Sequence, residues 1–137
     1  MRRFFPLAAT LAALSALVPT DALAQERLLA HYIADLGDED HRTSSGQRLT
    51  SFAALIAQDR ANFHRFGISH RHDQSDPIFS DRAMRAQIGP RVMDVPHYYE
   101  QYARNVLSCT RGCGTYMVVD VYGYGRTITR ITIEVPG

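Results

Sequence analysis

The segment Thr115–Tyr122 (TYMVVDVY) consists mainly of β-branched and aromatic residues, which favour a β-strand. Gly123, Tyr124 and Gly125 follow it and predict a turn, and Thr127–Val135 (TITRITIEV) then alternates apolar with polar residues, as a half-buried strand does. These segments therefore predict a C-terminal β-hairpin. A lone hairpin is only marginally stable in water, so its apolar face must pack against other elements of the chain.

The best-defined of those other elements is a helix in the middle of the chain. The hydroxyl of Thr50 or Ser51 can accept a backbone N–H as an N-cap, and the apolar residues that follow recur at helical spacing. We expect the helix to continue to Phe66 and to stop at Gly67, which can adopt the left-handed conformation that commonly ends a helix.

Two shorter helices are expected between this helix and the hairpin. Ser80 is the expected N-cap of a helix over Asp81–Ile88, which Gly89–Pro90 would end. A third helix is predicted to begin near Pro96 and to reach about Leu107, because its tyrosine and aliphatic residues make one apolar face.

The first part of the mature chain completes the predicted fold. Arg27–Ala34 is too short for its periodicity to distinguish a strand from a helix, and we favour a strand that joins the hairpin. Asp35–Gln47 is acidic and rich in Gly, Ser and Asp, which indicates a loop. The sequence thus predicts an α+β fold with about three short helices packed on a small antiparallel sheet that includes the C-terminal hairpin.

The N-terminal segment Met1–Ala24 has the pattern of a secretory signal peptide. Two arginines precede an apolar run over Phe4–Val18, and Ala22-Leu23-Ala24 supplies small residues before Gln25. Cleavage at this point would leave Gln25–Gly137 as a single small α+β domain, in the periplasm or secreted.

No membrane anchor is expected after that cleavage. The apolar run is short for a membrane span and is interrupted by Pro6 and Pro19. No cysteine stands at the cleavage point, so there is no thiol to carry a lipid.

The charge of the chain argues against a nucleic-acid partner. All 15 basic residues are arginines, they face 14 acidic residues, and the formal net charge of the whole chain is +1. Loss of the signal peptide would bring the balance to neutrality, whereas nucleic-acid binding needs a net basic surface.

Cys109 and Cys113 are the two cysteines of the chain, and three residues lie between them. In an oxidising compartment an isolated nearby pair most simply forms an intrachain disulfide. The spacing lacks the two-residue separation of thioredoxin-type redox sites, so we expect the bond to hold a turn and not to take part in redox catalysis.

Asp59 is the most unusual residue of the predicted central helix. At 100° per residue it falls within the apolar stripe that contains Phe52 and Leu55, and a buried charge without a partner is costly. Two explanations remain open. Asp59 accepts hydrogen bonds from the backbone of the Ser44-Ser45-Gly46 loop or pairs with an arginine, or it is a functional carboxylate at a cleft.

On the second explanation, the neighbouring polar residues of the helix belong to a binding site. The predicted binding residues are Asp59, Asn62, His64 and Arg65.

A group of histidines and aspartates follows the helix and is the densest set of possible metal ligands. His70, His72 and Asp73 are the candidate ligands, since imidazole and carboxylate suit zinc or a similar divalent ion. The spacing matches no established zinc signature, and Arg65 and Arg71 among the ligands weaken cation binding. The remaining histidines are expected to be exposed or hydrogen-bonded within the fold: His31, His41 and His97.

Two stretches carry a resemblance to other proteins. Ser44–Ser51 (SSGQRLTS) and Gln58–Gly67 (QDRANFHRFG) resemble a group of small secreted bacterial proteins with no assigned function, so the resemblance implies export and assigns no role. Arg42–Leu49 is also similar, more faintly, to a segment of the rare-lipoprotein-A-type septal glycan-binding barrels. Those proteins continue into further strands, whereas this chain continues into a predicted helix.

No motif of a serine hydrolase, phosphate-binding loop or dinucleotide site is present. The sequence therefore favours an exported, non-catalytic binding or accessory protein without a cofactor, whose partner is another envelope protein or a small ligand. The alternative is a metal-dependent hydrolase acting on cell-envelope material, with His64, His70 and His72 as ligands and Asp59 as base. A stability or folding factor with an exposed tyrosine-rich patch is a third possibility.

Overall fold

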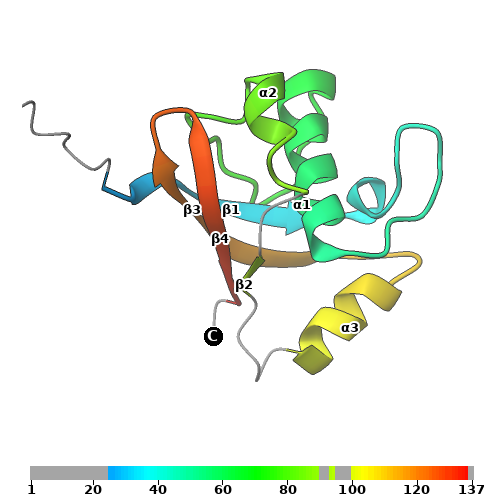
Figure 1. Ribbon diagram of the computed structural model, residues 1–137. Coiled ribbons are helices and arrows are strands. Elements are labelled where there is room, and N and C mark those ends of the chain that lie inside the picture. Colours follow the sequence, from blue (N-terminus) through cyan, green and yellow to red (C-terminus); the bar gives the residue numbers. More distant parts are fainter. Residues whose placement is uncertain (1–24, 90–92, 95–99, 136–137) are drawn as a thin grey trace, which may run out of the picture.

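The structure is a computed structural model that describes residues 25–89, 93–94 and 100–135 (Figure 1). Its strands are β1 (Arg27–Leu36), β2 (Met93–Asp94), β3 (Thr115–Tyr124) and β4 (Thr127–Glu134). Its helices are α1 (Phe52–Ala61), α2 (Arg82–Arg85) and α3 (Glu100–Ser108), with a 3₁₀ turn, η1 (Asp38–His41), and a π-helical turn, η2 (Asn62–Phe66). No helix within the described residues is long and apolar enough to cross a lipid bilayer.

The four strands form one sheet in the order β1-β3-β4-β2. β3 pairs antiparallel with both β1 and β4, while the two residues of β2 pair parallel with β4. The predicted α+β class, the hairpin and the strand over Arg27–Ala34 are confirmed. The hairpin turn lies later than predicted, because Gly123 and Tyr124 still pair with β4 and Gly125 takes the positive φ of 56°.

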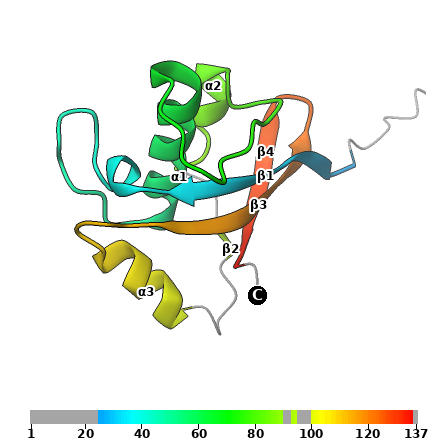
Figure 2. The same cartoon turned by 180° about the vertical axis from the view of Figure 1, so that it is seen from behind.

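The core lies between the sheet and the first two helices. α1 and α2 lie on one side of the sheet, and α3 lies on the other side of β1 and β3 in both views (Figures 1 and 2). Alternate residues of β1 and β3, among them Tyr32, Ala34, Met117 and Val119, are buried, as expected for strands that pack one face. The same core buries Leu55 and Ile56 of α1, together with Phe79 before α2 and Ile88 after it.

The helical segment formed by α1 and η2 begins and ends as its sequence predicts, although its last turn is different. Oγ of Ser51 accepts the N–H of Ala54 over 3.2 Å and caps the first turn. Gly67 ends the helical segment with a φ of 66°, and its N–H bonds the carbonyl of Asn62. The residues between Ala61 and Gly67 form the π-helical turn η2, a wider turn that periodicity alone does not reveal.

The other predicted boundaries need correction. α2 is only four residues long, and its N-cap is Asp81 in place of Ser80, since Oδ1 of Asp81 accepts the N–H of Ala83. α3 is described from Glu100, so its predicted start near Pro96 lies outside the described residues. The predicted loop over Asp35–Gln47 instead continues β1 by two residues and contains the turn η1.

The predicted disulfide between Cys109 and Cys113 is present. Two groups fasten its loop to the rest of the domain. The carboxylate of Asp38 accepts the N–H of Gly112 over 3.0 Å and that of Cys113 over 2.6 Å. Nη2 of Arg48 donates to the carbonyls of Leu107 and Cys109. The disulfide thus secures the connection from α3 to β3.

Candidate functional site

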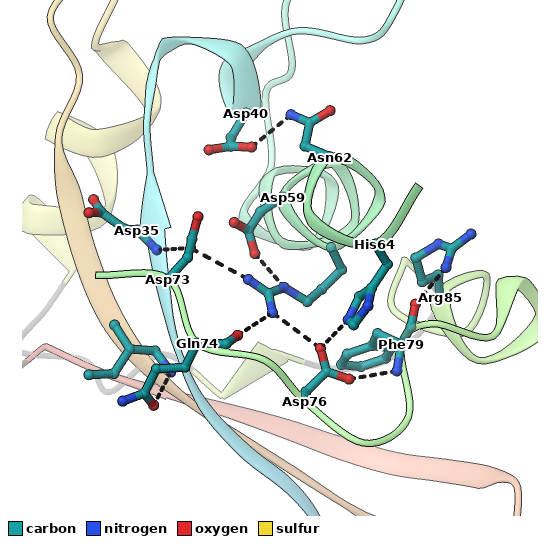
Figure 3. Close-up of polar contacts among 12 residues, drawn as sticks. Asp35, Asp40, Asp59, Asn62, His64, Asp73, Gln74, Asp76, Phe79 and Arg85 are labelled. Carbon is teal, nitrogen blue, oxygen red and sulfur yellow. Dashed lines mark hydrogen bonds and ion pairs between the residues drawn. The ribbon is translucent and has the colours of Figure 1, made fainter. Parts of the chain in front are cut away.

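Arg60 lies at the centre of a buried polar cluster under α1. Its side chain has no exposed surface, and it contacts three carboxylates. Nε donates to Asp59 over 2.7 Å, Nη1 donates to Asp76 over 3.1 Å, and Nη2 lies 3.5 Å from Asp73 (Figure 3). We call Arg60 with these three aspartates the Arg60 cluster.

Two aromatic rings also contact the guanidinium of Arg60. Its Cζ lies 4.3 Å from the ring centroid of Tyr32 and 4.8 Å from that of Phe63. A guanidinium over an aromatic face is stabilised by cation–π attraction, more so where water is excluded. The fully buried cation is therefore held both by opposite charges and by the rings of two different elements.

The charges of the cluster shift the protonation of its members. Burial alone would lower the pKa of Arg60, but the acidic groups around it, Asp59 foremost, together raise it, so Arg60 keeps its charge. For Asp59 the cost of burial outweighs the attraction of Arg60 and raises its pKa to about 7. A carboxyl with 1% of its side chain exposed cannot reach a substrate without opening the fold.

Asp76 joins the cluster to His64 and to the turn before α2. Its Oδ1 accepts the N–H groups of Ile78 and Phe79, over 3.0 and 2.6 Å, and its Oδ2 accepts Nε2 of His64 over 2.6 Å. Burial opposes the charged form of Asp76, yet these hydrogen bonds and that of Arg60 lower its pKa overall. Asp76 is thus a buried carboxylate whose two oxygens are both occupied (Figure 3).

Asp73 fixes the segment after η2 alongside β1. Its Oδ1 accepts the N–H of Asp35 over 2.8 Å, and its Oδ2 accepts the N–H of His70 over 2.6 Å. The next residue, Gln74, exchanges two hydrogen bonds with Ile33, one through its own N–H and one through its side-chain oxygen. The segment from His70 to Gln74 therefore runs beside β1 and bonds to its backbone.

Asn62 connects the helical segment to the turn η1. Its Nδ2 donates to Oδ1 of Asp40 over 2.8 Å, and its Oδ1 accepts from Gln58 over 2.9 Å. The other oxygen of Asp40 accepts the N–H of Gly37. Burial raises the pKa of Asp40, although the bonds from Asn62 and Gly37 offset part of that effect.

The two histidines predicted to bind metal contact different carboxylates. Nε2 of His70 lies 3.0 Å from Glu39, and its Nδ1 faces Asp40 at 3.3 Å. Burial opposes the charged form of His70, but Glu39 and the nearby aspartates raise its pKa overall. His72 instead bonds Asp35 over 3.0 Å and rests on the ring of Tyr116.

The predicted ligands do not form a metal-binding arrangement in the part of the chain that the structure describes. No group of three or more histidine, cysteine, aspartate or glutamate side chains there could hold a metal ion. Asp73 is the predicted third ligand. Its two oxygens accept two backbone N–H groups, and its Oδ1 also lies beside the cation of Arg60.

The predicted binding residues are placed as follows. Asp59 and Asn62 are buried, His64 exposes 10% of its side chain, and Arg65 is exposed. Of the two explanations for Asp59, the structure shows the pairing with an arginine. The helical pattern did not indicate that Arg60 is the partner, because Arg60 lies about 80° from Phe52 at 100° per residue, at the margin of the apolar stripe.

His41 and His31 are placed as expected. His41 is buried, with Nδ1 2.8 Å from the carbonyl oxygen of Gly37 and Nε2 3.1 Å from that of Val106. It borders a cavity of about 340 Å³ next to the disulfide. His31 is exposed and lies 2.6 Å from Asp120, and His97 lies outside the described residues.

A second cavity, of about 450 Å³, opens at the surface between α1 and α2. Its lining consists of three arginines and three alanines: Arg65, Arg82, Arg85, Ala57, Ala61 and Ala86. We call it the arginine pocket. Arg85 donates to the carbonyls of Phe79 and Ser80, and Arg65 rests on the ring of Phe66. None of the three arginines forms an ion pair with a carboxylate of the described residues.

The chain was compared with known proteins at three levels. No family model matches the sequence, no curated protein matches it, and no solved structure matches the fold.

Proposed function

We propose that this protein is an exported, periplasmic binding or accessory protein without a catalytic role, which contacts a small ligand or another envelope protein. The observation that carries the proposal is the position of Arg60. Its guanidinium is buried among Asp59, Asp73 and Asp76, the carboxylates that acid–base or metal chemistry would need. Those groups stabilise the fold, and the groups left for recognition lie at the surface.

The metal-dependent hydrolase is the alternative function, and the same contacts count against it. A permanent cation within 3.5 Å of Asp73 repels a divalent ion at that carboxylate. His64 bonds Asp76, and His72 bonds Asp35, so each side chain would have to leave a carboxylate to join a shared ligand set.

The proposed location rests on the signal-peptide pattern of Met1–Ala24 together with the disulfide. Disulfides persist in oxidising compartments such as the periplasm. Kinship with the small secreted bacterial proteins that share the SSGQRLTS and QDRANFHRFG segments is part of the same proposal. Intact-mass analysis of the protein recovered from the periplasm tests this point, with a chain beginning at Gln25 as the expected result.

Elemental analysis of that mature protein, purified without a histidine tag or chelators, tests the choice between the two functions. We expect less than a tenth of an equivalent of zinc, manganese or iron, both as isolated and after reloading, as an order-of-magnitude criterion. About one equivalent that disappears in His70→Ala/His72→Ala would instead support the hydrolase. Crosslinking in the periplasm then identifies the partner. A protein with Arg71→Ala, a change at an exposed residue, is crosslinked in parallel as the control.

A further inference from the structure

The arginine pocket concentrates positive charge that the fold does not neutralise. Arg65 and Arg82 are exposed, and Arg85 is half-buried at the same opening. Like charges that share a concave surface repel one another and raise its affinity for anions. Because the mature chain is close to neutral, this charge is a local feature of the surface and not an effect of composition.

Three other arginines near the surface of the described chain have acidic partners, whereas the three in the pocket are gathered in one place without any. Arg126 pairs with Asp81, Arg130 pairs with Glu26, and Arg104 pairs with Glu100. Asp81 is adjacent to Arg82 in sequence, but its carboxylate caps Ala83 and binds Arg126. The carboxylate next to Arg82 in sequence is therefore already engaged, and Asp81 is not among the residues that line the pocket.

The pocket is also built to hold its guanidinium groups in place. Nη1 of Arg85 is fixed by the carbonyls of Phe79 and Ser80, 2.5 and 3.0 Å away, which leaves its other N–H groups to face a ligand. Arg65 is supported by the ring of Phe66, whose centroid is 4.9 Å from its Cζ. A guanidinium that is already oriented loses less entropy when it binds an oxyanion.

The alanines of the pocket leave the space that a ligand needs. Ala57 and Ala61 lie one helical turn apart on α1, and Ala86 follows α2, so short side chains separate the arginines. A cavity of about 450 Å³ is large enough for a phosphate together with a small organic group.

We infer that the arginine pocket binds a small phosphomonoester through Arg65, Arg82 and Arg85. A phosphomonoester is close to a dianion at neutral pH and has three terminal oxygens, which three guanidinium groups can share. A monocarboxylate has one charge and two oxygens, so it would leave part of the pocket unneutralised. This inference rests on the proposed binding function and adds the place and the chemical class of the ligand.

Calorimetric titration of the mature protein with inorganic phosphate and with glycerol phosphate tests the inference, with acetate as the comparison anion. The ionic strength is held constant with sodium chloride, because screening alone changes the affinity of a charged ligand. Arg65→Ala and Arg82→Ala are the test variants, since both side chains are exposed and neither donates a hydrogen bond or forms an ion pair within the described residues, although Arg65 contacts the ring of Phe66. Arg71→Ala is the matched control, an exposed arginine outside the pocket.

We expect both phosphates to bind more tightly than acetate, and each test variant to lose about tenfold in affinity, the equivalent of one charge-assisted hydrogen bond. The Arg71→Ala protein should bind like the parent. Arg85→Lys keeps the charge but not the planar geometry, and a loss there with unchanged thermal stability would further support the site.

Three outcomes would overturn the inference. They are no binding of either phosphate, equal affinity for acetate, or binding that Arg65→Ala and Arg82→Ala leave unchanged. Vesicles containing phosphatidic acid distinguish a lipid headgroup from a soluble ligand, and binding to vesicles alone would also contradict a soluble phosphomonoester. If the phosphate titrations fail, elemental analysis and crosslinking still test the proposed binding function. Failure of this inference is therefore distinguishable from failure of the proposed function.

Discussion

The imidazole of His70 occupies the space beside Gly37 that a side chain would need. A Cβ on Gly37 would lie 2.1 Å from Nε2 of His70, closer than any two such atoms can approach. The contact joins the end of β1 to the segment that follows η2, and it keeps His70 near Glu39 and Asp40.

Gly37→Ala should therefore destabilise the domain by about 1–3 kcal/mol, the usual cost of forcing extra atoms into a packed site. The φ of Gly37 is −86°, which alanine adopts readily, so the cost arises from the contact with His70 and not from the backbone. Urea denaturation followed by circular dichroism measures the change.

Gly114→Ala is the control for that substitution, because a Cβ there meets nothing within 4 Å. The double variant Gly37→Ala/His70→Ala should be more stable than the sum of the two single effects predicts, since the alanine then has room. Strict additivity of the two effects would contradict the steric explanation.

Removal of the buried cation should be the most damaging change in the chain. Arg60→Met keeps much of the side-chain volume but leaves Asp59, Asp73 and Asp76 without their shared partner. Breaking a buried ion pair on one side costs about 3–5 kcal/mol, a large part of the stability of a small domain. Denaturant unfolding should show this loss, and Arg71→Met should show almost none. Equal stability of the two variants would mean that the Arg60 cluster is not the structural centre described above.

The protonation of Asp59 should make stability depend on pH. Its pKa is about 7 in the folded protein against 3.8 ordinarily, so between these values the folded state retains a proton that the unfolded state has lost. The stabilisation from this proton is complete below pH 3.8 and disappears as the pH rises through 7. The expected contribution to the slope is at most about 1.4 kcal/mol per pH unit.

Asp59→Asn isolates that contribution from the other groups that titrate. The variant should lack the fall in unfolding free energy between pH 4 and 6 that Asp59 causes in the parent protein. His70, whose pKa is raised, contributes in the same direction, but its effect is lost only above about pH 6.5. A parallel pH profile for the two proteins over pH 4–6 would show that Asp59 remains ionised in the folded state.

The disulfide should contribute modestly to stability, since its ring is small. The chain-entropy model gives about 2 kcal/mol for a loop of this length. Cys109→Ser/Cys113→Ser should lower the unfolding free energy by that amount, and dithiothreitol should lower it equally in the parent protein but not in the variant. Asp38→Asn should add little to the double variant if the carboxylate acts mainly by holding the closed loop. Full additivity would instead assign Asp38 a role of its own.

The sequence predicted the elements of this fold better than their connections. Alternation in Thr127–Val135 and the cap at Ser51 are local signals, and both strand and helix form where these signals place them. The π-helical turn at Asn62–Phe66 and the four-residue length of α2 depend on tertiary packing, which no local pattern contains.

In the candidate site too, the local feature was predicted and the tertiary contacts were not. The position of Asp59 in the apolar stripe correctly indicated a buried carboxylate that requires a donor. The identity of that donor could not be read from the helix, because Arg60 owes its burial to Tyr32, 28 positions earlier, and to Asp76, 16 positions later. The arginine pocket likewise combines α1 and α2, so its members become neighbours only after folding.

β1 is one of the two edge strands of the sheet, and on its free side the N–H groups of Ile33 and Asp35 donate to the side-chain oxygens of Gln74 and Asp73. An unoccupied outer strand can accept a strand from another molecule, which is a common route to aggregation. The Arg60 cluster holds the covering segment in place through Asp73, with Nη1 also donating to the carbonyl of Gln74. Loss of the Arg60 cation should therefore make the protein aggregate sooner at high concentration. This is expected even under conditions in which folded protein is still detected.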